Sequence, residues 1–133
     1  MVNNVKQNII NDTIVFESEE DIKTIVKTIV QENVNKVDSK DPFWEKVEET
    51  LLNAIFLYVF YEYSEADKNL LSAKKLLHSR TANNLESMFE KLEEDNPNHP
   101  AAKMYNLFSY STGHKVRQAI LAICKNNSFL QLN

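Results

Sequence analysis

Glycine is almost absent from this sequence of 133 residues, in which the only glycine is Gly113. Phosphate-binding loops of the G-x-x-x-x-G-K-[ST] type and dinucleotide-binding turns of the G-x-G-x-x-G type both need several glycines, because their backbone approaches a phosphate where a Cβ would intervene. Neither motif can be present. The sequence therefore contains no motif for nucleotide binding, and we expect no cofactor.

Cysteine and histidine are also scarce. The single cysteine, Cys124, excludes an intrachain disulfide and any zinc site built from several cysteines, which agrees with a reducing cytoplasmic setting. We expect it to be a small buried apolar residue. His78, His99 and His114 form neither an H-E-x-x-H motif nor a close pair, so solvent-exposed, capping or packing roles are expected and no metal site is predicted.

Long hydrophobic runs are missing as well. The most apolar stretch runs from Leu51 to Tyr61 and contains Asn53, whereas a helix that spans a bilayer needs about 20 apolar residues. This stretch predicts a buried core helix instead of a membrane anchor. The N-terminus has no apolar region or cleavage site typical of a secretory signal. Any membrane attachment is expected to lie outside this sequence.

The composition itself is that of a globular domain. Hydrophobic residues make up 43% of the chain, which for this length favours one compact domain with one core. Charged residues make up 26%, an ordinary value that argues against disorder over most of the length.

Helical periodicity begins at Ser18. This residue starts Ser-Glu-Glu-Asp, a variant of the capping box with Asp21 at its last position, and apolar residues at helical spacing follow. They predict a first helix over about residues 19–33. The residues before it, 1–17, are predicted to be an extended lead-in, because only residues 13–16 favour β structure and they have few partners for pairing.

A second helix is predicted to begin at Asp41 and Pro42, since Asp is a good cap and Pro suits the first helical turn. It continues to about Tyr63. After Thr50 the sequence is apolar on nearly every side of this helix, which predicts that other helices surround it.

Four shorter helical segments follow, each with one apolar face. Their predicted starts are a cap at Asn69, a cap at Asn83 or Asn84, the pair His99-Pro100, and Gly113. No strand alternation, internal repeat or long heptad pattern is sustained. We therefore predict an all-α fold, an irregular bundle of about six helices around a central apolar helix, with the domain at residues 18–125 and an irregular tail at residues 126–133.

The order of several short motifs resembles that of a known family. The motifs are D-P-F-W-E-K at residues 41–46, L-L-N-A at 51–54, L-E-S-M-F-E at 85–90, H-P-A-A-K-M-Y at 99–105 and G-H-K-V-R-Q-A-I at 113–120. Over residues 18–125 the chain is similar to the all-alpha domain of type IV secretion coupling proteins of the TraG/VirD type, especially those of Gram-positive conjugative elements. The first motif is fairly specific, and the shared order of the later ones supports it. The last motif departs from the G-K-T-A-K-S that is usual in the family.

The resemblance implies a function and a setting. In the family this domain is inserted into a RecA-like ATPase domain of a membrane-anchored, hexameric motor, so residues 1–17 would be a former connection to that motor. The chain would be a cytoplasmic domain of an inner (plasma) membrane protein and would recognise substrates for conjugative DNA transfer by binding relaxase and the accessory proteins of the relaxosome. The alternatives are a DNA-contacting module at the mouth of the hexamer and a structural insert that supports assembly. ATPase activity would belong to the parent protein, and the isolated chain would be a monomer without enzymatic activity.

Charge divides the sequence into two parts. The last 33 residues contain four basic residues and no acidic one, whereas the first 100 residues contain eleven basic and nineteen acidic residues. In the acidic part, an acidic helix face is the candidate for binding a basic relaxase, and the alternative is an ordinary solvated face. Its candidate residues are Glu86, Glu90, Glu93 and Glu94.

In the basic part, Lys103, Lys115 and Arg117 are candidates for contacting single-stranded DNA, with stacking by Tyr105, Phe108 and Tyr110. The alternative is that these aromatic residues belong to the core and that the cations are spread apart. The sequence pI of about 5.4 argues against strong DNA binding by the chain alone. Trp44 likewise has two interpretations, a packing anchor or an exposed docking residue.

Overall fold

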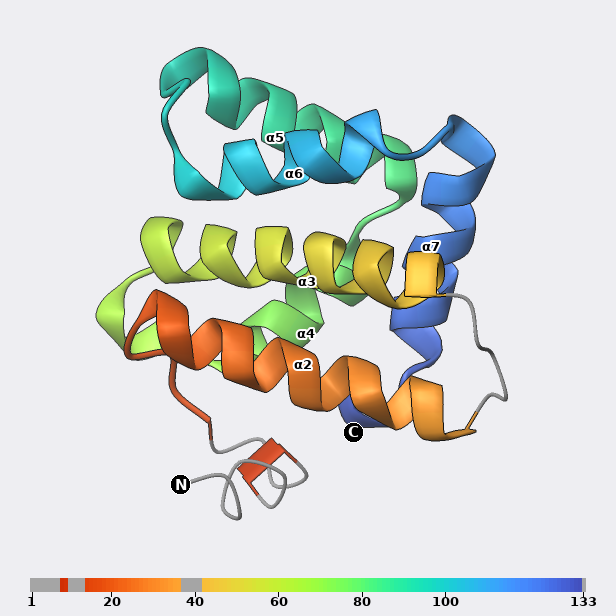
Figure 1. Ribbon diagram of the computed structural model, residues 1–133. Coiled ribbons are helices and arrows are strands. Elements are labelled where there is room, and N and C mark those ends of the chain that lie inside the picture. The colour runs from red at the N-terminus through yellow and green to blue at the C-terminus, as the bar shows by residue number, and fades with distance from the viewer. Residues whose placement is uncertain (1–7, 10–13, 37–41, 133) are drawn as a thin grey trace.

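The computed structural model describes residues 8–9, 14–36 and 42–132, apart from the side chains of residues 33–36. Within these residues the helices are α2 (Glu19–Lys36), α3 (Pro42–Glu62), α4 (Leu70–Ser79), α5 (Ala82–Asp95), α6 (Pro100–Tyr110) and α7 (His114–Asn126), with short 3-10 helices η1 (Glu65–Asp67) and η2 (Ser128–Leu130) (Figure 1). The same residues contain no strand, and their β pairing is an isolated antiparallel bridge between Val15 and Asn69. The predicted all-α fold is confirmed.

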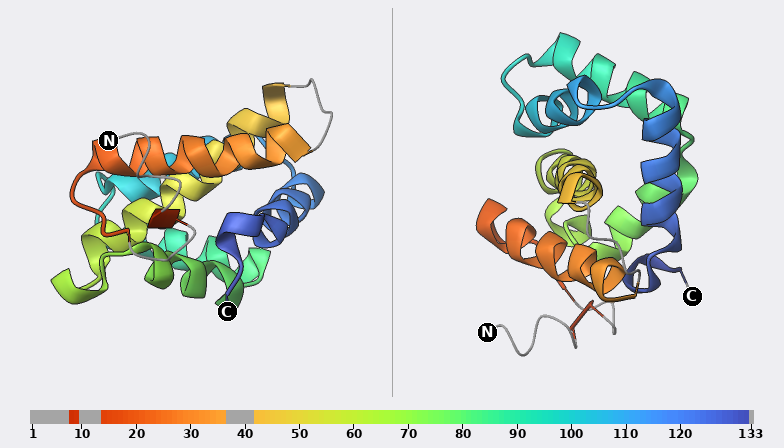
Figure 2. Two further views of the ribbon diagram at one scale, coloured as in Figure 1. Left: turned by 90° about the horizontal axis from the view of Figure 1, so that it is seen from below. Right: turned by 45° about the vertical axis from the view of Figure 1, so that its right-hand side comes forward.

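Helix α3 is the centre of the bundle. It lies between a layer formed by α5 and α6 and a layer formed by α2 and α4, and it contacts α2, α4, α6 and α7 (Figure 1). Figure 2 shows α7 along the side of the bundle, reaching from the α5–α6 layer toward α2. Phe56 of α3 is fully buried and stacks on Phe16 with ring centroids 5.2 Å apart. The expectation that this apolar helix is surrounded by others is confirmed.

Side-chain caps at the helix starts follow from the local sequence. Ser18 Oγ accepts a hydrogen bond from the Asp21 amide at 3.1 Å, while Asp21 Oδ2 accepts from the Glu17 amide at 3.3 Å and not from that of Ser18. The capping box is therefore displaced by one residue. Asn69 Oδ1 caps α4 by accepting from the Ser72 amide at 2.9 Å, as predicted.

The start of α5 corrects the sequence prediction. Thr81, and not Asn83 or Asn84, is the N-cap, and its Oγ1 accepts a hydrogen bond from the Asn84 amide at 3.1 Å. Thr and Asn are both good caps, and the extended backbone of Thr81 leaves its hydroxyl free to reach the third helical amide. Helix α5 therefore begins at Ala82, two or three residues earlier than a cap at Asn83 or Asn84 predicts. The predicted cap at Asp41 lies outside the described residues.

The segment before α2 contributes to the core. Ile14 and Phe16 are buried, and their extended backbone pairs with the start of α4: the Phe16 amide donates to the Lys68 carbonyl at 2.8 Å, and the Leu70 amide donates to the Ile14 carbonyl at 3.0 Å. Ile9 is also fully buried, but it is helical. An extended backbone was predicted for all of residues 1–17, and the helical backbone of residue 9 contradicts this prediction. A single buried apolar side chain gives no periodic pattern from which a helix can be recognised.

The segment after α7 is ordered by burial in the same way. Phe129 and Leu130 of η2 are buried, and so is Asn127. The Asn127 side chain donates from Nδ2 to the Ile29 carbonyl of α2 at 2.8 Å and accepts at Oδ1 from the Phe129 amide at 2.9 Å. A one-turn helix is too short to show periodicity, which is why the sequence indicated only an irregular tail here.

Candidate functional site

Helix α5 carries the acidic candidates on the sides that its core residues leave free. It buries Leu85, Phe89 and Leu92, and Phe89 stacks on Tyr105 of α6 with ring centroids 4.4 Å apart. This packing fixes the rotation of α5 about its axis. The remaining sides face α6, solvent and the groove between α5 and α3.

The packing of α5 divides the four acidic candidates into two pairs. Glu86 lies 3.8 Å from the Arg117 guanidinium of α7, and the Glu93 carboxylate accepts a hydrogen bond from Asn106 Nδ2 of α6. Both residues are half-buried, so they join helices to one another. Glu90 and Glu94 are exposed and form no ion pair with any residue that the structure describes. These two residues, called here the acidic pair, are the part of the predicted face that is free to meet a partner.

The basic candidates do not form one patch. Arg117 donates from Nη1 to the Ser109 and Thr112 carbonyls, at 3.1 and 2.9 Å, and thereby holds the connection between α6 and α7. Lys103 and Lys115 are exposed, but Lys103 lies in the first turn of α6 and Lys115 in the first turn of α7, with most of α6 between them.

The aromatic residues of this region belong mainly to the core. Tyr105 and Phe108 are 4% and 2% exposed, which is the alternative interpretation given for them above. Burial, with a smaller contribution from the nearby Glu86 carboxylate, raises the pKa of Tyr105 to about 12. Tyr110 differs, because it is 85% exposed, and Leu107 one turn earlier is 59% exposed. A stacking surface for DNA would therefore rest on Tyr110.

Two further residues singled out in the sequence have packing roles. Trp44 is half-buried against the core and makes an edge contact with Phe43, whose ring centroid lies 5.5 Å away. Cys124 is fully buried, as expected, and burial raises the pKa of its thiol well above the ordinary value, with an added effect from the Glu48 carboxylate. The Cys124 thiol is therefore not accessible at the surface.

Two of the histidines are also structural. His99 caps α6, because its Nδ1 accepts from the Ala101 amide at 3.1 Å, and its Nε2 then donates to the Glu62 carboxylate at 2.9 Å. His78 Nε2 donates to the Leu130 carbonyl at 2.7 Å and so ties α4 to η2. Throughout the described ranges, no group of three or more His, Cys, Asp or Glu side chains is placed to hold a metal ion. In the same ranges, no helix has the length and apolar character needed to cross a bilayer.

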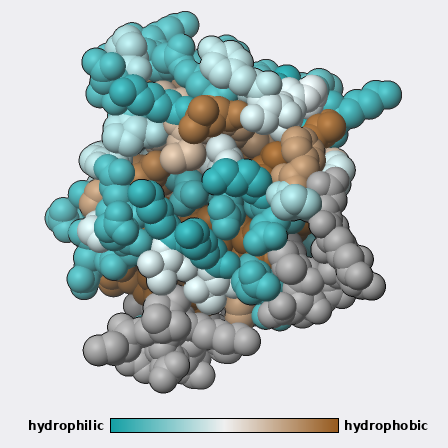
Figure 3. All heavy atoms as spheres, viewed as in Figure 1, coloured by the Kyte–Doolittle hydropathy of each residue, from teal (hydrophilic) through white to brown (hydrophobic). Residues whose placement is uncertain are grey.

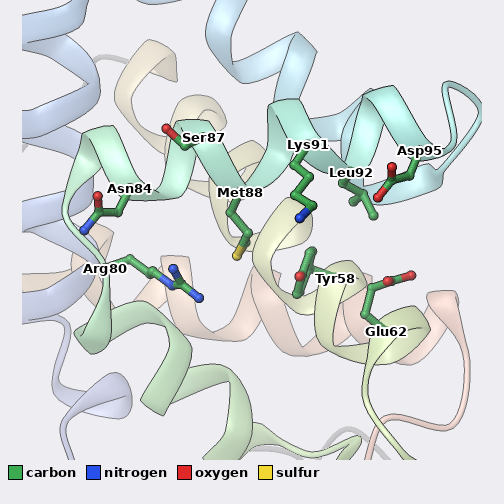
Figure 4. Close-up of a pocket in the computed structure, with 9 residues that line it drawn as sticks. All are labelled: Tyr58, Glu62, Arg80, Asn84, Ser87, Met88, Lys91, Leu92 and Asp95. Carbon is green, nitrogen blue, oxygen red and sulfur yellow. The ribbon is translucent and has the colours of Figure 1, made fainter.

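A cleft of about 490 Å³ opens between α5 and α3, and neither Glu86 nor Glu93 lines it (Figure 4). It is lined by Tyr58 and Glu62 of α3, by Arg80, and by Asn84, Ser87, Met88, Lys91, Leu92 and Asp95 of α5. No pattern in the sequence predicts this cleft. The polar lining residues of α5 recur at helical spacing, and this spacing could have indicated a polar side of the helix. The facing residues Tyr58, Glu62 and Arg80 come from other parts of the chain, so the sequence could not show that they lie opposite.

Comparison of the chain with protein-family models, with curated proteins and with solved structures finds no match.

Proposed function

We propose that this chain is the substrate-recognition module of a type IV coupling protein and that it binds relaxase and relaxosome accessory proteins for conjugative DNA transfer. The ordered motifs between residues 18 and 125 support this proposal, and the all-α bundle agrees with it. In this proposal the parent protein is a hexameric ATPase at the plasma membrane, and the domain meets its substrates on the cytoplasmic side. ATP hydrolysis belongs to the motor, and the isolated domain is a monomer.

The observation that carries the proposal is the acidic pair. Glu90 and Glu94 stand one turn apart on α5, in an outer layer of the bundle, and their charges are not neutralised by the fold. Proteins that process DNA carry basic surfaces, and opposite charge increases the rate of encounter and disfavours wrong partners. Exposed charges each contribute little binding energy. Exposed charges therefore suit a reversible, salt-sensitive contact from which the bound relaxase is released again.

The surface around α6 is consistent with such a contact. Leu107 and Tyr110 are exposed one turn apart on α6, which packs beside α5. Aromatic and apolar residues of this kind often provide the anchors of an interface whose rim is charged. The face shown in Figure 3 is largely hydrophilic, with small separate apolar areas, and this favours a transient partner over a permanent one.

The second candidate function is a DNA-contacting module at the mouth of the hexamer. The observation in its favour is Tyr110, whose exposed ring could stack on a base, together with the exposed cations Lys103 and Lys115. It is the weaker candidate because Arg117 is already engaged by the α6–α7 connection. A purely structural insert that supports assembly would need neither surface.

The test measures capture of the relaxase encoded by the same element on the immobilised chain, across a range of salt concentrations. We expect the double variant Glu90→Lys with Glu94→Lys to weaken capture at least about tenfold and to flatten its salt dependence, because two attractive contacts become repulsive. The matched control reverses Glu17 and Glu65, which are exposed carboxylates outside α5. This control should retain capture, and both double variants should keep the helical circular-dichroism signal.

A titration with single-stranded DNA at physiological salt accompanies the capture assay. Capture that survives reversal of the acidic pair, but is lost when Lys103 and Lys115 are replaced by Ala, would contradict the proposal and favour the DNA-contacting module. Equal loss in the acidic-pair variant and in its control would show that net charge, and not this surface, determines capture.

A further inference from the structure

The cleft between α5 and α3 is an open groove that follows α5. Its α5 residues recur every three or four positions from Asn84 to Asp95, which corresponds to a length of about 16 Å. Tyr58 and Glu62 of α3 form the facing wall, and Arg80 reaches in from the connection between α4 and α5 (Figure 4). An extended peptide segment of about five residues fits such a length, at about 3.3 Å per residue.

Two cations line this cleft. The side chains of Arg80 and Lys91 both extend into it, Arg80 from the connection between α4 and α5 and Lys91 from α5, with Met88 between them in the view of Figure 4. Neither forms an ion pair within the part of the chain that the structure describes. Glu62, at the far end of the cleft, is held by His99 at 2.9 Å. Charge-assisted hydrogen bonds to a guanidinium and an ammonium group are strong, so these two cations favour an anionic group in the cleft.

An apolar surface lies directly beside the cations. Leu92 is buried, and Tyr58 and Met88 are half-buried against the core. Burial, with the nearby Glu62 carboxylate, raises the pKa of Tyr58, so its hydroxyl stays protonated and available as a donor. A ligand that combined an anion with an adjacent apolar group would use both parts of the cleft.

We propose that this cleft binds an extended peptide segment of a partner protein in which an acidic side chain is followed by an apolar one. The carboxylate pairs with Arg80 and Lys91, and the apolar side chain packs on Met88 and Tyr58. A phosphate group is disfavoured, because the carboxylates of Glu62 and Asp95 repel a second negative charge and the apolar surface gives a phosphate nothing to bury. The acidic pair does not line the cleft, so this site goes beyond the proposed recognition of relaxase and does not depend on it.

The test is an NMR titration of the full chain with the blocked peptide acetyl-Glu-Leu-Ala-Ala-Ala-amide. We expect saturable shifts of amide signals from the cleft residues of α5, with weak affinity. The matched peptide with Gln in place of Glu should bind about fivefold more weakly, because it lacks the charge that pairs with the two cations. Inorganic phosphate serves as the third ligand. The proposal is overturned if the cleft signals do not saturate, if the Gln peptide binds equally well, or if phosphate binds more tightly than the Glu peptide.

Variants locate the site within the chain. Arg80→Gln and Lys91→Gln should each weaken binding of the Glu peptide about fivefold. Folding should be preserved, because Lys91 is exposed and the Arg80 carbonyl, not its side chain, accepts the hydrogen bond from Lys125. Lys75→Gln makes the same change in net charge at an exposed position of α4 outside the cleft and should leave binding unchanged. An equal effect of all three variants would overturn the site. Relaxase capture is measured separately through the acidic pair, so failure of the peptide titration does not affect that proposal.

Discussion

Replacement of Arg117 tests whether this residue holds the fold or contacts DNA. Its side chain is only 18% exposed, and Nη1 donates to the Ser109 and Thr112 carbonyls at 3.1 and 2.9 Å. The Ser109 carbonyl also accepts from the Thr112 amide at 3.3 Å, so the guanidinium is an additional donor to it. Arg117 thus holds the segment in which α6 turns into α7, and its Nη2 lies 3.8 Å from Glu86 on α5. The guanidinium therefore joins three helices at one corner of the bundle.

The expected cost of Arg117→Ala follows from these contacts. A hydrogen bond from a charged donor contributes about 1.5–3 kcal/mol, but water can replace part of it at a corner near the surface. The pair with Glu86 at 3.8 Å adds less than about 1 kcal/mol. We expect a loss of about 2 kcal/mol in the free energy of unfolding, which corresponds to a decrease of about 6–10 °C in melting temperature for a domain of this size.

Thermal and urea unfolding followed by circular dichroism measure this loss. Arg117→Lys keeps the charge but not the guanidinium fork, so it should lose most of the same stability. Lys115→Ala, at an exposed neighbouring position, should change stability by less than about 0.5 kcal/mol. If Arg117→Ala melts like the wild type while binding of single-stranded DNA falls, the structural role assigned to Arg117 is refuted.

Two further predictions concern buried polar groups. Asn127→Ala should lower the free energy of unfolding by about 2 kcal/mol, because it removes the hydrogen bond to α2 and the acceptor of the buried Phe129 amide. The control Asn126→Ala, at the exposed neighbouring position, should melt within about 2 °C of the wild type. Equal effects of the two substitutions would contradict the structural role of Asn127. Tyr105 has a pKa of about 12 in the fold and about 10 when unfolded, so the stability it contributes is complete below pH 10 and is lost as pH rises toward 12. Urea unfolding between pH 9 and 12 should therefore show a smaller loss of stability in Tyr105→Phe than in the wild type, and parallel curves would argue against the shifted pKa.

The functional candidates were only partly predictable from the sequence. Periodicity on α5 identified its acidic residues, but whether a carboxylate is free depends on which helix packs beside it. Glu93 meets Asn106, and Glu86 meets Arg117, only because α6 and α7 lie against α5. Likewise, Tyr105 and Tyr110 belong to one short helix, and the rotation of that helix decides which of them is buried.

Local signals in the sequence determined the helical class, the central position of the apolar helix, and the helix starts at Asn69, His99 and Gly113. These features depend on residues within a turn of one another, where capping and periodicity act. Only the tertiary structure decided the burial of the two terminal segments and the cleft that Arg80, Lys91 and Tyr58 line. These contacts join residues that are distant in sequence or that face one another only after helices pack, so their geometry is set by the shape of the whole core.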